Sequence, residues 1–71
     1  MNELRYLPSV EKIIQYPESE EWISKFGRDQ TIRAIRETLD FFRSEIKSGK
    51  RAPDQPEINS QIQKILSDRF S

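Results

Sequence analysis

The sequence predicts an all-α fold, a small four-helix bundle of short helices, and three observations lead to that prediction. Apolar residues recur at helical spacing in four separate segments of the 71-residue chain. The four prolines stand near the starts of these segments and the two glycines near the ends of two of them, as is typical of helices. Apolar and polar residues do not alternate over a useful length, so strands are not expected. A chain of this length forms one domain with a thin core.

The first predicted helix spans about residues 9–15. Ser9 follows a proline and is a suitable N-cap, because its hydroxyl can accept a hydrogen bond from a free backbone N–H of the first turn. The apolar face consists of Val10, Ile13 and Ile14, and Leu4 and Leu7 are expected to fold back onto it.

The second predicted helix spans about residues 17–26 and opens with Pro17, whose fixed φ suits the first helical position. Its first turns are rich in acids, which the helix dipole favours there: Glu18, Glu20 and Glu21. Trp22 and Phe26 lie one turn apart and are expected in the core. Gly27 is expected to end the helix.

The third predicted helix, about residues 29–48, is the longest and most regular. Its apolar residues step by three and four and form one seam: Ile32, Ile35, Leu39, Phe42 and Ile46. Such a seam packs either within the chain or against a second chain in a coiled coil. It lasts fewer than three heptads, which is short for a coiled coil, so we expect packing within the chain.

The fourth predicted helix spans about residues 55–69, with Pro56 tolerated in its first turn. Its apolar residues also recur at helical spacing: Ile58, Ile62, Ile65 and Leu66, with Phe70 following.

Composition excludes several classes of function. Lys and Arg number 12 and Asp and Glu number 12, so this is not a polycation that binds any nucleic acid through bulk charge. The chain has no cysteine and no histidine, which removes disulfides, thiolate metal sites and the commonest general base. No apolar run approaches the roughly 20 residues that cross a bilayer. We therefore expect a cytoplasmic protein with no membrane partner, no metal site and no catalytic residue.

The zero net charge is the sum of unequal charges in three segments of the chain. Residues 1–21 carry a net charge of −3, residues 22–51 carry +4 and residues 52–71 carry −1. With Ile32 at heptad position a, bases gather on one flank of the third helix: Arg36, Arg43 and Lys50 at e, and Arg33 and Lys47 at b. Asp40 is the only acid there. Such a flank either binds phosphates, which arginine can grip bidentately, or is a solvated helix face, and charge alone slightly favours the solvated face.

Three motifs follow one another in residues 4–51. They are Leu4-Arg5-Tyr6-Leu7-Pro8-Ser9-Val10 followed by Ile13-Ile14, then Phe26-Gly27-Arg28, then Ala34-Ile35-Arg36-Glu37-Thr38-Leu39 with Arg43 seven residues after Arg36 and Gly49 closing the helix. In this order and spacing they resemble the N-terminal region of bacterial selenocysteine synthase, the L-seryl-tRNA(Sec) selenium transferase. The chain departs from the family at Thr31-Ile32, where a more apolar pair is usual, and residues 52–71 match only as a generic amphipathic helix.

The resemblance implies that residues 1–71 are a helical N-terminal domain that recognises tRNA(Sec), mainly through its D-arm. In that family the full-length enzyme converts L-seryl-tRNA(Sec) to L-selenocysteinyl-tRNA(Sec) with selenophosphate, uses pyridoxal phosphate, and assembles as a ring of dimers. The catalytic pyridoxal-phosphate domain is absent from this chain. The chain alone is therefore expected to hold no cofactor, to have no enzyme activity and to be a monomer.

Arg36 and Arg43 match the family motif and lie on the basic flank, so they are the leading candidates for RNA binding. The charge pattern adds four more: Arg33, Lys47, Lys50 and Arg51. Alternatively, Arg36 and Arg43 brace neighbouring helices through their aliphatic stems. The alternative function is a protein-interaction or oligomerisation module without RNA binding, with the apolar seam or the Trp22/Phe26 pair as its contact.

Overall fold

The computed structural model describes residues 6–70, and this part of the chain forms four α-helices and no strand. The helices are α1 (Val10–Ile14), α2 (Pro17–Phe26), α3 (Arg28–Lys47) and α4 (Gln55–Phe70). The predicted all-α class is confirmed, and each helix bound lies within one residue of the expected position. Leu4 and Arg5, which open the first motif, lie outside the described residues.

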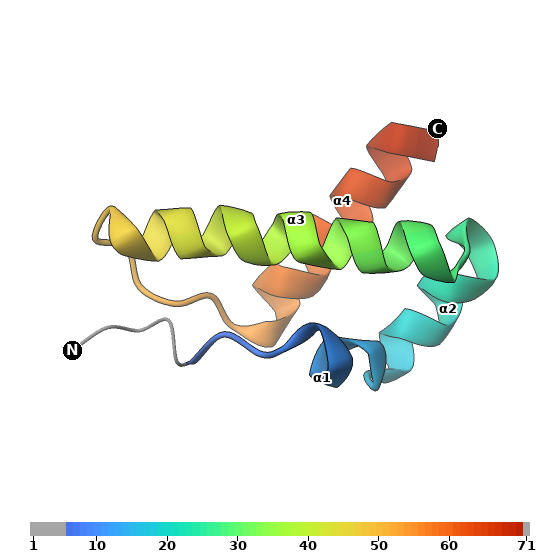
Figure 1. Cartoon of the computed structure of the whole chain (residues 1–71), viewed down its shortest axis with the longest axis horizontal. Helices are drawn as coiled ribbons and strands as arrows, with labels where there is room; N and C mark the ends of the chain where they lie inside the picture. The colour runs from blue at the N-terminus through green and yellow to red at the C-terminus, as the bar shows by residue number, and fades with distance from the viewer. Residues whose placement is uncertain (1–5, 71) are drawn as a thin grey trace.

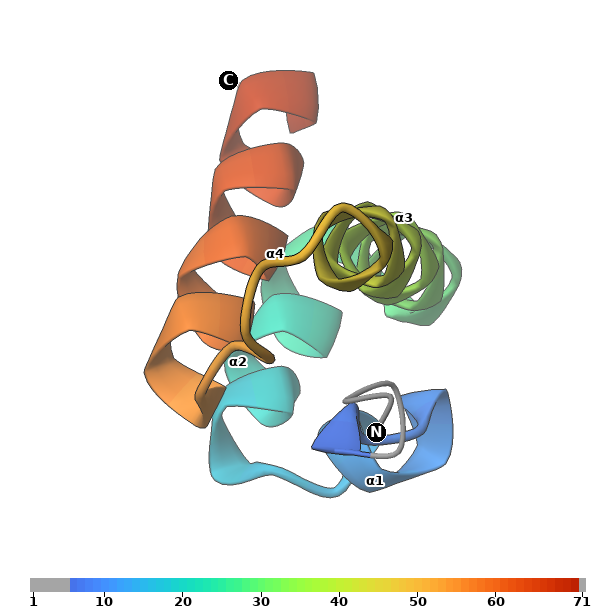
Figure 2. The same ribbon diagram turned by 90° about the vertical axis from the view of Figure 1, so that its left-hand side faces the viewer.

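The long helix α3 organises the fold, because it contacts each of the other three helices. It runs across the whole molecule, and α4 crosses it at a steep angle (Figure 1). Figure 2 looks along α3 and shows α4 and α2 to one side of it and α1 below it. The remaining side of α3 is left open to solvent.

Two helices begin with the side-chain caps that their sequences offer. The Ser9 hydroxyl accepts a hydrogen bond from the backbone N–H of Lys12 at 3.1 Å, as predicted for α1. Before α4, the Asp54 carboxylate accepts a bond from the Glu57 N–H at 2.9 Å, and the Glu57 carboxylate accepts one from the Asp54 N–H at 3.4 Å. This reciprocal pair is a capping box, and it fixes the start of α4.

A single residue, Gly27, separates α2 from α3 and allows the sharp change of direction between them. Its φ of 89° and ψ of 154° lie in a region that is essentially restricted to glycine. Its carbonyl accepts two hydrogen bonds from Thr31, one from the backbone N–H at 3.1 Å and one from the hydroxyl at 2.8 Å. The glycine thus closes α2 and starts α3.

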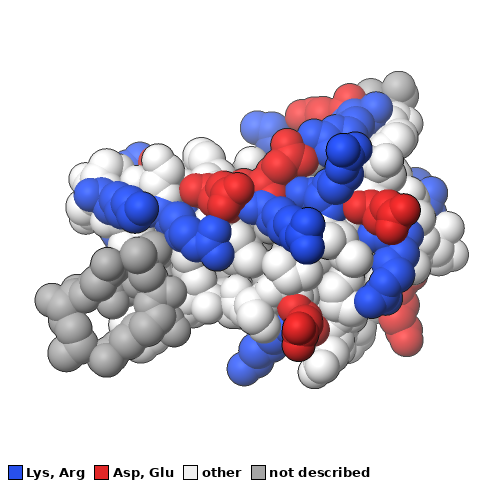
Figure 3. All heavy atoms as spheres, viewed as in Figure 1, with Lys and Arg blue, Asp and Glu red and all other residues white. Residues whose placement is uncertain are grey.

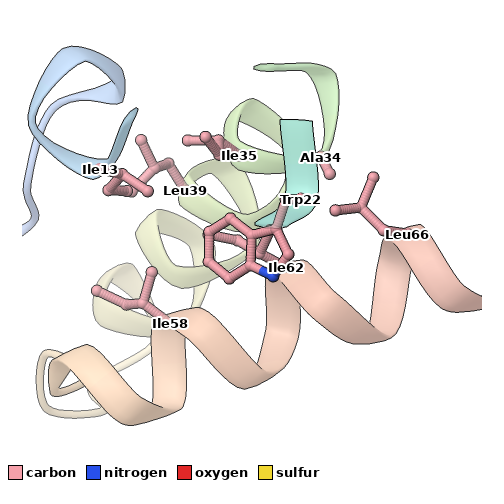
Figure 4. Close-up of a cluster of buried hydrophobic side chains, with 8 residues drawn as sticks. All are labelled: Ile13, Trp22, Ala34, Ile35, Leu39, Ile58, Ile62 and Leu66. Atoms are coloured by element: carbon pink, nitrogen blue, oxygen red, sulfur yellow. The ribbon is translucent and has the colours of Figure 1, made fainter. Parts of the chain in front are cut away.

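All four helices contribute to one hydrophobic core (Figure 4). Its buried members are Ile13 from α1, Trp22 from α2, Ala34, Ile35 and Leu39 from α3, and Ile58, Ile62 and Leu66 from α4. The alternative of a coiled-coil seam on α3 does not describe this packing, because Ile35 and Leu39 are covered by the chain's own helices. Trp22 is only 4% exposed, as expected for a core residue, and Phe26 packs against the cluster.

The buried face of α3 is wider than the predicted seam. Thr31, Ala34 and Thr38 are fully buried, whereas Ile32 and Phe42 of the seam are only half-buried. Ala34 and Thr38 are not members of that seam. Ala34 is buried because it lies in one cluster with Ile62 and Leu66 of α4, the helix that crosses α3.

Candidate nucleic-acid interface

Four of the predicted RNA-binding residues lie on the exposed side of α3: Arg33, Arg36, Arg43 and Lys47. Their orientation is set by the core, because Ile35 and Leu39 point inward and successive helical residues are 100° apart. We call these four residues the α3 basic row. Figure 3 shows basic side chains along the length of α3, with acidic side chains between them. All four residues are exposed.

The row is interrupted by one ion pair. Arg43 donates from Nη1 to Oδ1 of Asp40, one turn earlier, at 2.7 Å. Within the described part of the chain, Arg33, Arg36 and Lys47 form no ion pair. Among the described residues, the donors of these three side chains have no ion-pair partner, so they are available to a ligand.

Lys50 does not extend the row, which corrects its assignment to the same heptad position as Arg36 and Arg43. α3 ends at Lys47, so Lys50 lies in the connection to α4 and has no helical register. The Ser48 and Gly49 backbone, with φ of 102° at Gly49, closes the helix. The ammonium group of Lys50 then turns back to Glu45 at 2.9 Å. Arg51 lies in the same connection, is exposed, and forms no ion pair with any described residue.

The structure adds one basic residue that the sequence did not suggest. Arg69, in the last turn of α4, donates from Nη2 to both carboxylate oxygens of Glu37 on α3, at 2.8 and 2.9 Å. Arg69, Glu37, Arg33 and Arg36 line a hollow of about 450 Å³ between the two helices. No local pattern indicates this contact, because Glu37 and Arg69 are 32 residues apart in the chain.

A second hollow lies beside the first along α3. It has a volume of about 470 Å³ and is lined by Asp29, Gln30, Ile32, Arg33 and Arg36. Arg33 and Arg36 line both hollows, so these two arginines stand between them.

No group of three or more potential metal ligands occurs among residues 6–70. The five lysines are all exposed, and none lies in an enclosed cavity such as pyridoxal phosphate needs. None of these lysines is therefore placed to hold that cofactor. Within residues 6–70, every helix is too short or too polar to span a membrane.

Comparison with known proteins places the chain in one family. Residues 4–41 match the family described as "Selenocysteine synthase N terminal". The chain is similar to L-seryl-tRNA(Sec) selenium transferase of Carboxydothermus hydrogenoformans, with 38% identity over 48 residues. That alignment covers 68% of this chain and 10% of the relative, so the chain corresponds to a small part of that protein. No solved structure matches the chain with significant similarity.

The matched residues 4–41 include α1, α2 and most of α3, and therefore Arg33 and Arg36 of the basic row. They make up more than half of the chain. The observed helical fold agrees with what the resemblance implied. The chain belongs to the selenocysteine synthase N-terminal family.

Proposed function

We propose that residues 1–71 form a tRNA(Sec)-binding N-terminal domain and act in selenocysteine biosynthesis as part of a longer L-seryl-tRNA(Sec) selenium transferase. The observation that carries this proposal is the α3 basic row, which is exposed and largely unpaired in a chain of this family. Pyridoxal phosphate and the conversion of L-seryl-tRNA(Sec) to L-selenocysteinyl-tRNA(Sec) belong to the catalytic part of the longer protein. The proposed setting is the cytoplasm, with the full-length enzyme as a ring of dimers.

The charge distribution supports recognition of a particular RNA rather than attraction to any nucleic acid. Every tRNA has the same backbone charge per nucleotide, so a strongly basic domain would not discriminate among them. This domain is neutral overall, and four of the five bases of α3 lie on one side of that helix. A localised basic row binds phosphates only where the RNA shape presents them to it, which is how folded RNA is commonly distinguished. The D-arm of tRNA(Sec) is the proposed contact.

The decisive experiment reverses two charges of the row. The double variant Arg36→Glu/Arg43→Glu should bind fluorescently labelled tRNA(Sec) at least tenfold more weakly than the unmodified chain, because each position then repels a phosphate. Its circular dichroism should remain helical, since both side chains are exposed. The matched control is Lys12→Glu/Lys64→Glu, which changes the net charge equally at exposed positions of α1 and α4. Equal loss in both variants, or none in the first, would reject the α3 row as the RNA-binding surface.

Sedimentation separates this function from the alternative interaction module. A monomer that binds tRNA(Sec) agrees with the proposal. A dimer that is insensitive to salt and indifferent to tRNA supports the interaction module. Of the contacts considered for that module, Ile35 and Leu39 of the seam and Trp22 are already buried in the core of the chain, and Phe26 packs against it.

A further inference from the structure

The hollow between α3 and the end of α4 brings together three arginines from two helices. Arg33 and Arg36 come from α3, and Arg69 comes from α4. Glu37 is the only acid among the lining residues. The local charge is therefore +2, although the chain as a whole is neutral.

We propose that this hollow is a phosphate site for the RNA backbone and that Arg69, held by Glu37, is one of its ligands. The inference rests on the proposed function, because it names where a phosphodiester of the tRNA sits. It also extends the interface from α3 to α4, a helix that lies beyond the matched residues 4–41. We call this hollow the three-arginine site.

The geometry of the ion pair leaves Arg69 free to bind an anion. A guanidinium group has five N–H donors in a fixed planar fork. Arg69 uses only Nη2 toward Glu37, and both carboxylate oxygens contact that one nitrogen. The donors on Nη1 and Nε have no partner among the described residues. The carboxylate thus orients the fork and leaves a second edge available for a phosphate oxygen.

The exposure of the pair also argues against a purely structural role. The Arg69 and Glu37 side chains are 38% and 50% exposed. An exposed ion pair adds at most a small amount to the stability of a fold, because water already solvates both charges. An arginine held in place in a basic hollow is, by contrast, preorganised for a phosphate and loses less side-chain entropy on binding.

The test compares two substitutions that have different expected effects on RNA affinity. Arg69→Gln removes a ligand and should lower the affinity for labelled tRNA(Sec) about tenfold, the loss of one charge-assisted hydrogen bond. It should also reduce the magnitude of the slope of log K against log salt by about one, because one phosphate contact is lost. Glu37→Gln keeps an acceptor for Arg69 but removes the negative charge, so the affinity should rise or stay equal.

A merely bracing ion pair gives a different pattern. If Arg69 acts only by joining α3 to α4, both substitutions should lower stability and RNA affinity in the same direction. That result overturns the inference, and so does an unchanged affinity and salt slope for Arg69→Gln. The matched control is Lys64→Gln, also an exposed base of α4, which lies outside the hollow and should leave the slope unchanged.

A second measurement separates failure of this inference from failure of the proposed function. Inorganic phosphate is titrated into the chain while the arginine Nε–H signals are followed by nuclear magnetic resonance. The signals of Arg33, Arg36 and Arg69 should shift more than that of the exposed Arg28, even if the chain does not bind tRNA(Sec). If these three signals shift in a chain that does not bind tRNA(Sec), the phosphate site is supported and the proposed function is rejected. Equal shifts at Arg69 and Arg28 reject the site, whatever the affinity for tRNA.

Discussion

Arg43 and Asp40 form a 2.7 Å hydrogen bond one turn apart on the exposed side of α3, within the row proposed to bind RNA. The two side chains are 51% and 72% exposed, so the pair contributes little to stability. Its main effect is electrostatic, because the carboxylate neutralises one base of the row. If the row binds RNA as proposed, Asp40 is expected to weaken that binding.

Removing that carboxylate should strengthen RNA binding. At a separation of several ångströms in water, one negative charge repels a phosphate by about 0.6 kcal/mol, so Asp40→Asn should raise the affinity about threefold at low salt. The gain should shrink as salt is added. Fluorescence anisotropy with labelled tRNA(Sec) measures both quantities. Glu11→Gln on α1 removes an exposed acid outside the row and is the control. An Asp40→Asn variant that binds no better than this control contradicts the placement of phosphates along α3.

Two fully buried threonines on α3 should respond oppositely to the same substitution. The hydroxyl of Thr31 donates to the Gly27 carbonyl at 2.8 Å, whereas the hydroxyl of Thr38 has no hydrogen-bond partner among the described residues. Valine has nearly the shape of threonine but no hydroxyl. Thr31→Val should therefore lower the free energy of unfolding by about 1 kcal/mol, and Thr38→Val should raise it by about 1 kcal/mol. Urea unfolding followed by circular dichroism measures both, and a loss at Thr38 as large as that at Thr31 contradicts the assignment.

The helices could be predicted from the sequence because each is marked by local signals. Helical apolar spacing, Ser9 as a cap and Gly27 as a stop all act within a few residues of one another. The wider buried face of α3 could not be predicted in the same way. Alanine and threonine occur both in cores and on surfaces, so residue type alone could not predict the burial of Ala34 and Thr38, which depends on tertiary packing.

The residues of the candidate site also fall into two groups, those that the local pattern predicts correctly and those that it does not. Arg33, Arg36, Arg43 and Lys47 follow from helical periodicity, and their exposure follows from the burial of the opposite side of α3. Lys50 was misplaced because the helix ends three residues before it, and the periodic pattern carries no information past that point. Arg69 was missed because its partner Glu37 is distant in sequence, and only tertiary packing brings the two together.

Replacing Gly27 should destabilise the domain even though there is room for a side chain. A Cβ built at this position meets no atom within 4 Å, so steric overlap with neighbouring groups is not the reason. The cost lies in the backbone, because φ of 89° with ψ of 154° is a conformation that alanine rarely adopts. Gly27→Ala should lower the free energy of unfolding by about 1–3 kcal/mol. Thermal unfolding measures the loss, and Gln30→Ala, an exchange in the first turns of α3 with ordinary helical geometry, is the control. A Tm unchanged from the control contradicts the strain argument.

The smallest folding unit should extend well past residue 41, where the family match ends. Ile58, Ile62 and Leu66 of α4 are at most 2% exposed and complete the core that α1, α2 and α3 begin. Without α4, the apolar sides of Trp22 and Ile35 would face water, and a domain this small has little stability to lose. A chain ending at residue 54 should therefore lose helicity in α1–α3 as well, and Ile62→Ala in the full chain should cost about 2–5 kcal/mol. Circular dichroism of both variants tests this. Phe41→Ala is the control, because Phe41 is 44% exposed and its removal leaves the core cluster intact. A shortened chain that keeps its helices and a cooperative unfolding transition contradicts the prediction, since the core would then be complete without α4.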